Sequence, residues 1–127
     1  MAEHNEFGKK GEEIAARYLQ KKGYIILERD WRYGRSKSDL DIIAKTPDEA
    51  MVVFVEVKTR QPDALVDPYF SINRQKIHHL GRCAHDYIKL KEIAEDVRFD
   101  VIFVIINKET DDTRIDHIES AFNPLLL

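Results

Sequence analysis

Residues 51–58 read Met-Val-Val-Phe-Val-Glu-Val-Lys, and this stretch determines both the fold class and the candidate site. Its valines and its phenylalanine are strong β-formers, so it predicts a strand. Because side chains alternate between the two faces of a strand, Glu56 and Lys58 share one face with Phe54. A carboxylate in so apolar a run is poorly solvated, and buried charges are paired or metal-bound. The alternative interpretation is an exposed Glu–Lys ion pair.

An acidic strand precedes this stretch. Residues 39–44 read Asp-Leu-Asp-Ile-Ile-Ala, so Asp39 and Asp41 share a face. A tight turn at residues 46–49 makes the two strands antiparallel neighbours. Together they present two or three carboxylates and one ammonium group to a single surface. Mg²⁺ prefers such oxygen ligands, and a nearby lysine activates water or stabilises an oxyanion. The pattern is typical of a metal-dependent phosphodiesterase.

The rest of the chain completes an α/β order. Apolar residues at helical spacing predict helices over residues 5–22 and 71–91, the first with Asn5 as its N-cap and Gly23 as its stop. β-forming runs predict strands over residues 24–32, 39–45, 51–58, 98–107 and 114–118. The first three strands are expected to form an antiparallel meander, and strand 98–107 to be covered on both faces. Gly8 and Gly11 indicate that the first helix packs closely on another element.

Size and composition fit a single domain over residues 1–127. Of the 127 residues, 43% are hydrophobic and 34% are charged, as in an ordinary globular protein. The longest apolar run, residues 101–106, is too short to cross a bilayer, and the first ten residues lack the apolar core of a signal peptide. A lone cysteine, Cys83, excludes an internal disulfide and fits a reducing compartment. We therefore expect a cytoplasmic protein that does not engage a membrane.

Charge is unevenly distributed along the chain. Lys and Arg number 20 against 23 Asp and Glu, and the net charge of −3 counts against general, tight binding to nucleic acid. However, residues 70–91 are mainly basic and residues 92–119 mainly acidic, which predicts an anion-attracting side and a repelling side. A solvated helix face explains the basic run equally well. Lys76, near the start of the second predicted helix, either meets a phosphate or is one of several solvated lysines.

An acidic residue on one strand, Glu-x-Lys on the next and a glutamate on the preceding helix resemble the PD-(D/E)xK nuclease superfamily. More narrowly, the chain resembles the YraN-like family, small bacterial proteins predicted to be endonucleases similar to Holliday junction resolvases. The blocks that carry this resemblance, in order over nearly the whole chain, are residues 8–12, 23–24, 31–32, 39–44, 54–60, Lys76, 98–101 and 117–122. The resemblance implies a restriction-endonuclease-like αβββαβ core, with a mixed sheet flanked by helices.

The resemblance also implies roles for individual residues. Asp41 and Glu56 correspond to the metal-binding carboxylates, Lys58 to the catalytic lysine and Glu12 to a helix glutamate that reaches the metal site. We expect Mg²⁺ or Mn²⁺ as the cofactor, held by these carboxylates and the carbonyl of Val57. Flanking phosphates are expected to contact three further residues, Arg60, Arg74 and Lys76. The chain departs from the family pattern at Asp39, where glutamate is usual, and at Asp30, where asparagine is common.

The sequence therefore predicts a metal-dependent endonuclease that hydrolyses phosphodiester bonds in DNA, with branched or otherwise structured DNA as the candidate substrate. The alternative is a non-catalytic nucleic-acid-binding or protein-interaction module on a nuclease fold, which the acidic net charge favours. The apolar tail of residues 121–127 either docks on the body of the protein or binds a protein partner. By analogy with resolvases, whose two symmetric sites cut two strands, we also expect a homodimer.

Overall fold

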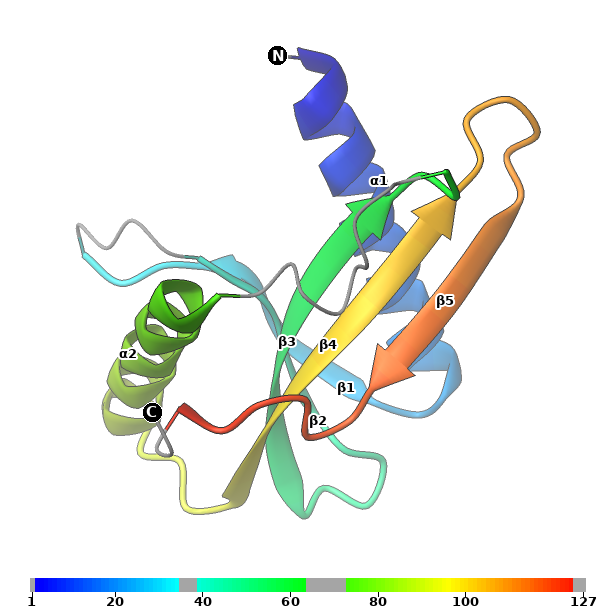
Figure 1. Cartoon of the computed structure of the whole chain (residues 1–127). Helices are drawn as coiled ribbons and strands as arrows, with labels where there is room; N and C mark the ends of the chain where they lie inside the picture. The colour runs from blue at the N-terminus through cyan, green and yellow to red at the C-terminus, as the bar shows by residue number, and fades with distance from the viewer. Residues whose placement is uncertain (1, 35–38, 64–72, 125–127) are drawn as a thin grey trace.

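The fold is a five-stranded mixed sheet with one helix on each face (Figure 1). The computed structural model describes residues 2–34, 39–63 and 73–124. Its elements are α1 (Ala2–Lys21), β1 (Ile25–Trp31), β2 (Leu40–Lys45), β3 (Met51–Arg60), α2 (Arg74–Leu90), β4 (Asp96–Ile106) and β5 (Thr113–Ile118). This order confirms the predicted α/β class, with an αβββαβ core and a mixed sheet flanked by helices.

Strand β3 is the middle of the sheet, whose order is β1-β2-β3-β4-β5. The first three strands pair antiparallel, as the short connections predicted. Strand β4 then pairs parallel to β3, since α2 carries the chain back across the sheet, and β5 closes the edge antiparallel to β4. Residues 52–57 and 100–106 are buried, which explains their nearly continuous apolar sequence.

The core lies in two layers, one on each face of the sheet. Under α1, the helix residues Ala15, Ala16 and Leu19 pack on strand residues that include Val53, Val55 and Val57. Under α2, the cluster includes Val52 and Phe54 from β3 and Leu80, Cys83, Ala84 and Tyr87 from the helix. The alternation along β3 therefore directs Glu56 and Lys58 toward the α2 side of the sheet.

The ends of the helices have identifiable caps. Helix α1 begins at Ala2, so the prediction that Asn5 is its N-cap was wrong. Its end at Gly23 was predicted correctly: Gly23 has φ +93°, its N–H donates to the Gln20 carbonyl, and the Tyr24 N–H donates to the Leu19 carbonyl, both at 3.0 Å. These two bonds form a Schellman motif, in which glycine adopts the left-handed conformation at low cost.

Part of the predicted tail docks on the protein itself. The Ala121 N–H donates to the Phe99 carbonyl at 2.8 Å, and the rings of Phe99 and Phe122 lie 5.4 Å apart. Pro124 lies against α2 at Gly81, where a Cβ atom would come within 2.6 Å of the proline. Residues 125–127, and residues 64–69 of the predicted loop at 59–69, lie outside the described residues.

No helix within the described part of the chain is long and apolar enough to span a membrane.

Helix α1 makes its closest approach to the sheet at Gly11. A Cβ atom there would overlap Oγ1 of Thr59 on β3 and lie 2.9 Å from the Thr59 Cβ, so only glycine fits. A Cβ at Gly8 would meet nothing within 4 Å. The prediction of close packing is thus confirmed at Gly11 and wrong at Gly8. The approach brings the next residue, Glu12, toward the end of β3 that carries Glu56 and Lys58.

We expect Gly11→Ala to lower the free energy of unfolding by about 1–3 kcal/mol, because the added methyl group forces α1 away from Thr59. The matched control is Gly8→Ala, which leaves the stability unchanged or raises it by up to about 1 kcal/mol through helix propensity. Urea denaturation of the two variants and the wild type measures both effects. Equal stability of the two variants would show that the close approach does not constrain the helix.

Candidate active site

Asp41 is held where the β2–β3 ladder stops. The register of the two strands ends with Ile42 opposite Val55. One step further along β3, the Val57 N–H donates to Oδ2 of Asp41 at 2.8 Å. Beyond the last backbone pair, the hydrogen bond between the two strands is therefore accepted by the Asp41 side chain and not by a backbone carbonyl. The bond fixes the Asp41 carboxylate beside the segment of β3 that carries Glu56.

Glu56 is a buried carboxylate with one satisfied oxygen and one unsatisfied oxygen. Its side chain is 6% exposed. Oε1 lies 3.4 Å from the Lys58 Nζ on the same strand and 3.9 Å from the Lys76 Nζ on α2. Oε2 is buried and has no hydrogen-bond partner among the residues that the structure describes. Because an unsatisfied buried polar atom costs about 1–3 kcal/mol, and more when it is charged, this oxygen is a ready acceptor for a ligand.

Two further carboxylates converge on Asp41. One carboxylate oxygen from each of Glu12, Asp30 and Asp41 lies within 4.8 Å of the others. Glu12 comes from α1, next to the tight contact at Gly11. Asp30 comes from β1, where the pairing of its chain neighbours with β2 places it opposite Asp41. Asp30 also has φ 52°, an uncommon conformation for a residue with a side chain.

Burial and the nearness of other acids raise the pKa of two of these carboxyl groups. Burial, together with a hydrogen bond to Asp30 and the charge of Asp41, raises the pKa of Glu12 to about 8. Burial and the charge of Glu56 raise the pKa of Asp41 to about 7, although the Val57 N–H and Lys76 oppose the shift. The site without a cation therefore retains protons at neutral pH. A bound cation would displace them, because carboxylate ligands bind metals in the ionised form.

The structure brings most of the predicted site residues together. Asp41 belongs to a group of three carboxylates with Glu12 and Asp30, and the charge of Glu56 acts on it, but Glu56 is not a member of that group. Lys58 on β3 and Lys76 in the first turn of α2 both approach Oε1 of Glu56. Val57 contributes its N–H to Asp41 in the structure, and the role of its carbonyl as a metal ligand stays a prediction.

The other residues predicted to bind phosphate lie around the site. Arg60, at the end of β3, donates from Nη1 to the Thr59 carbonyl at 2.8 Å, and Arg74 is exposed at the start of α2. Asp39, the acidic strand residue at which the chain departs from the family pattern, accepts a hydrogen bond from the Arg32 Nε at 2.5 Å.

Sequence reasoning missed the place of Asp30 in this cluster. The register of β1 against β2 would have identified it. Arg29 pairs with Ile42 and Trp31 pairs with Leu40, so Asp30 lies opposite Asp41. The sequence predicted both strands but did not fix their register.

A second buried polar cluster lies on β4 and is already satisfied. Asp100 is fully buried and accepts two bonds of 2.9 Å from Arg98, one of 2.8 Å from the His117 Nε2 and one of 3.0 Å from the Ser120 N–H. Burial raises the pKa of Asp100, but the bonds from His117 and Arg98 outweigh it and hold this pKa below its usual range. His117 also contacts the Tyr18 hydroxyl at 3.0 Å, so the cluster ties α1, β4 and β5 together.

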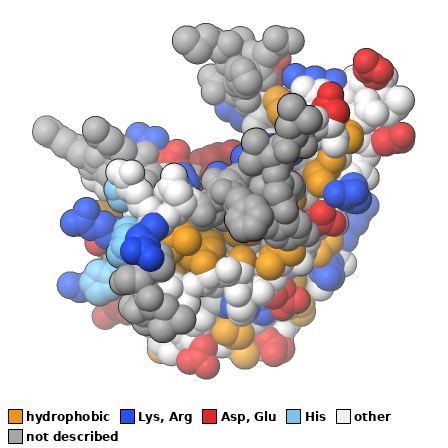
Figure 2. All heavy atoms as spheres, viewed as in Figure 1, with side chains coloured by type: hydrophobic (Ala, Val, Ile, Leu, Met, Phe, Trp, Pro, Cys, Tyr) orange, Lys and Arg blue, Asp and Glu red, His pale blue; other side chains and the backbone are white. Residues whose placement is uncertain are grey.

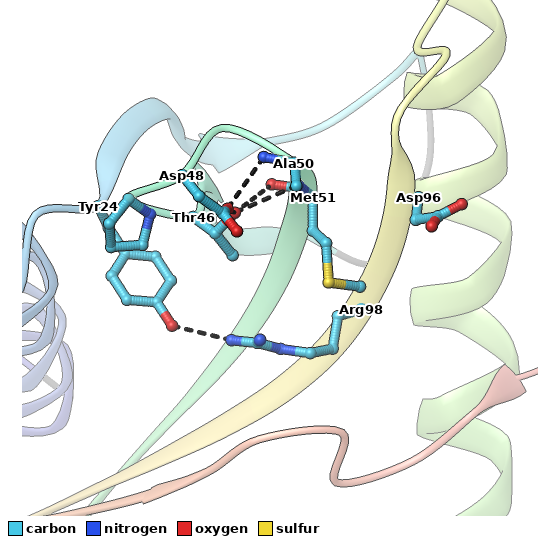
Figure 3. Close-up of a pocket in the computed structure, with 8 residues that line it drawn as sticks. Tyr24, Thr46, Asp48, Ala50, Met51, Asp96 and Arg98 are labelled. Atoms are coloured by element: carbon cyan, nitrogen blue, oxygen red, sulfur yellow. Dashed lines mark hydrogen bonds between the residues drawn. The ribbon is translucent and has the colours of Figure 1, made fainter.

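Figure 3 shows a pocket of about 580 Å³ beside this second cluster. Tyr24, Arg98 and the turn before β3 line it, and the Tyr24 hydroxyl accepts a bond from the Arg98 guanidinium at 2.9 Å. Arg98 also pairs with Asp100 and with Glu119. Its donors are therefore committed to the fold. The pocket lies near the start of β3, away from the carboxylates at the other end of that strand.

Comparisons with known proteins give a family but no activity. The sequence profile of the family described as "Uncharacterised protein family UPF0102" matches residues 11–104, a range that contains every candidate site residue. A "UPF0102 protein" of Bacteroides thetaiotaomicron is 46% identical over 126 residues, which cover 99% of each chain. One of Porphyromonas gingivalis is 42% identical over 127 residues, covering 100% of this chain and 90% of the relative.

Among solved structures, the chain is similar to Pyrococcus furiosus SfsA, whose structure is described as a complex with Ca²⁺. The sequence identity is 19% and the TM-score is 0.38, with 91% of this chain and 63% of the SfsA chain covered. At this TM-score the similarity carries no functional argument.

The raised pKa values predict how stability depends on pH. Unfolded Glu12 and Asp41 ionise near their ordinary pKa values of 4.5 and 3.8, whereas folded they ionise near 8 and 7. Between these limits the folded state binds more protons than the unfolded state, so stability is greatest below about pH 4 with respect to these groups and falls as pH rises to about 8. We expect the melting temperature of the metal-free protein to fall across this window. The control variant Glu6→Gln, which removes an exposed carboxylate of the same helix, keeps this slope, and Glu12→Gln flattens it.

A melting temperature that stays constant or rises from pH 6 to pH 8 in the metal-free wild type would contradict the raised pKa values of Glu12 and Asp41.

The second cluster predicts a large structural effect. We expect Asp100→Asn to lower the free energy of unfolding by about 3–5 kcal/mol, because the largely buried Arg98 would lose its buried carboxylate partner and keep only the exposed Glu119. The matched control is Asp116→Asn on the neighbouring strand, whose partner Arg114 is 69% exposed; such a surface pair contributes about 0–1 kcal/mol. Chemical denaturation of both variants makes the comparison, and similar effects in the two would refute the structural role of Asp100.

Proposed function

We propose that this chain, which belongs to the uncharacterised protein family UPF0102, is a Mg²⁺- or Mn²⁺-dependent endonuclease that hydrolyses phosphodiester bonds in DNA. The YraN-like resemblance predicted this family, and the proposed activity is inferred from the chemistry of the carboxylate site. The observation that carries the proposal is the buried, unsatisfied Oε2 of Glu56. The ion pair with Lys58 uses only Oε1, so Oε2 stays available to a ligand. Its presence beside Asp41 fits a site built to be completed by a cation.

The donor set fits a hard divalent cation. The residues that would hold it are Asp41 and Glu56, with Glu12, Asp30 and the carbonyl of Val57 completing an all-oxygen set. Mg²⁺ and Mn²⁺ prefer oxygen ligands of this kind, and no thiolate or imidazole belongs to the acidic group. When bound, such a cation supplies activation of a water molecule and neutralises charge on the phosphate.

Two lysines, Lys58 and Lys76, would supply the positive charge that interacts with the phosphate or the attacking water. Lys58 is 17% exposed, and its Nζ lies 3.4 Å from Oε1 of Glu56, which orients the ammonium group at the mouth of the carboxylate cluster. From there it would position the attacking water or donate to the phosphoryl oxygen that gains charge in the transition state. Lys76, which is 35% exposed, would bind the same or the adjacent phosphate. Arg60 and Arg74 would contact flanking phosphates without reading the bases.

The proposal predicts a cleavage activity that depends on the cation and on both strand residues. We expect the wild type to cut DNA in Mg²⁺ or Mn²⁺ and not in EDTA, with four-way junctions and plasmid compared as substrates. Glu56→Gln and Lys58→Ala should each reduce the rate by about 10²–10³-fold, the usual reduction when an electrostatic contribution to the transition state is removed. Glu109→Gln and Lys21→Ala, which change exposed residues outside the site, keep the wild-type rate.

Cleavage that survives in both site variants would assign the activity to a contaminant. If the folded wild type binds Mn²⁺ but cuts no DNA, the proposal fails, and the alternative of a non-catalytic module on a nuclease fold takes its place.

A further inference from the structure

The outward face of α2 carries a regular stripe of polar side chains that includes two basic residues and two histidines. Gln75, His78, Arg82, His85 and Lys89 are all exposed and follow one another at steps of three and four residues. This spacing places them on a single face of the helix. The buried residues Leu80, Cys83, Ala84 and Tyr87 occupy the opposite face. We call the five exposed residues the α2 stripe.

Three cations of this helix, Arg74, Arg82 and Lys89, differ from most other described arginines in having no acidic partner among the described residues. Five arginines elsewhere in the structure each pair with a carboxylate: Arg17, Arg29, Arg32, Arg98 and Arg114. Within the described ranges, Arg74, Arg82 and Lys89 form no ion pair. The helix itself contains a single acidic residue, Asp86. The charges of the stripe are therefore available to an anion from outside the chain.

The opposite side of the molecule is acidic. Figure 2 shows Lys, Arg and His side chains gathered on the left, over α2, and acidic side chains at the upper right, over the turn between β4 and β5. The exposed residues of that turn include Glu109, Asp111 and Asp112. An approaching polyanion is thus attracted by one side and repelled by the other, although the net charge of the chain is −3. This polarity favours the anion-attracting interpretation of the basic run over that of a merely solvated face.

The first turn of α2 reaches the candidate active site through Lys76, which by helical spacing lies on the same side of the helix as the buried residues Leu80, Cys83 and Tyr87 and not on the stripe. Lys76, in the first turn of α2, lies 3.9 Å from Glu56, and the helix then runs away from the carboxylates. At about 1.5 Å per residue, the distance from Arg74 to Lys89 is about 22 Å. At about 3.4 Å per base pair, this is the length of about six base pairs of duplex DNA. Tyr87, which is the only Phe, Tyr or Trp of the helix, is buried and offers no platform on which single-stranded bases could stack.

We propose that the α2 stripe binds the phosphate backbone of a duplex arm of the substrate and aligns that arm so that its end lies at Lys76 and Glu56. This inference rests on the proposed function and adds to it the substrate class: a DNA with a double-stranded segment adjoining the cut. Because the stripe binds phosphates, the arm is held without preference for its sequence.

The test is the salt dependence of duplex binding, measured by fluorescence anisotropy in the Glu56→Gln background so that no turnover occurs. We expect Arg82→Gln/Lys89→Gln to weaken binding of a short duplex by about tenfold and to reduce the slope of log K against log[salt] by about 2, which is about 1 for each cation removed from the phosphate backbone. The matched control is Lys108→Gln/Arg114→Gln near the acidic turn, which removes the same charge and keeps the affinity and slope of its parent.

Equal weakening by the two double variants would overturn the proposal, because net charge alone would then explain binding. Binding of a single strand as tightly as the duplex would overturn the assignment of a duplex arm. Both results are independent of catalysis, since the binding assay uses the Glu56→Gln background and cleavage is measured separately on the wild type. Unchanged melting temperatures of the exposed-site variants confirm that they fold.

Discussion

The burial of one carboxylate, that of Glu56, is the constraint that organises the rest of the site. Strand β3 is the middle strand of the sheet and has a helix packed on each face, and the side chain of Glu56 is only 6% exposed to water. Lys58 and Lys76 approach one of its oxygens and leave the other without a partner among the described residues. A protein that keeps a carboxylate oxygen in this state forgoes stability that an apolar side chain would supply. The most direct physical explanation is that a ligand from outside the chain completes it.

The other acidic residues are placed by independent features of the fold that meet at the same point. Asp41 is fixed by the Val57 N–H where the β2–β3 ladder ends, and Glu12 is brought in by the contact of Gly11 with Thr59. The pairing of β1 with β2 places Asp30 opposite Asp41. Burial, reinforced by the neighbouring acids, raises the pKa of Glu12 to about 8 and that of Asp41 to about 7, so the same arrangement that attracts a divalent cation retains protons when no cation is bound. Binding and proton release are thus expected to be coupled.

Local sequence signals predicted nearly all of the fold, and alternation along β3 predicted that Glu56 and Lys58 lie side by side. Period-two alternation was sufficient to place Glu56 with Lys58, and Gly23 was sufficient to end α1, because each is a local rule. Asp30 could not be predicted in this way, since its position depends on how β1 aligns with β2 across a connection of unspecified geometry. The start of α1 was missed because Asn5 has a good capping side chain but lies inside a helix that begins at Ala2. Gly8 and Gly11 look alike in sequence, and only the packing distinguishes them.

Calorimetric titration of Mn²⁺ into the purified protein would establish whether Glu56 and its neighbours form a cation site. We expect saturable binding to the wild type at pH 8 and no binding to Asp41→Asn/Glu56→Gln. Binding should be retained in Glu13→Gln, which removes an exposed carboxylate of α1 that pairs with Arg17 and Arg29. Binding that persists unchanged in the double variant, or that is absent from a folded wild type, would show that these carboxylates do not form a cation site.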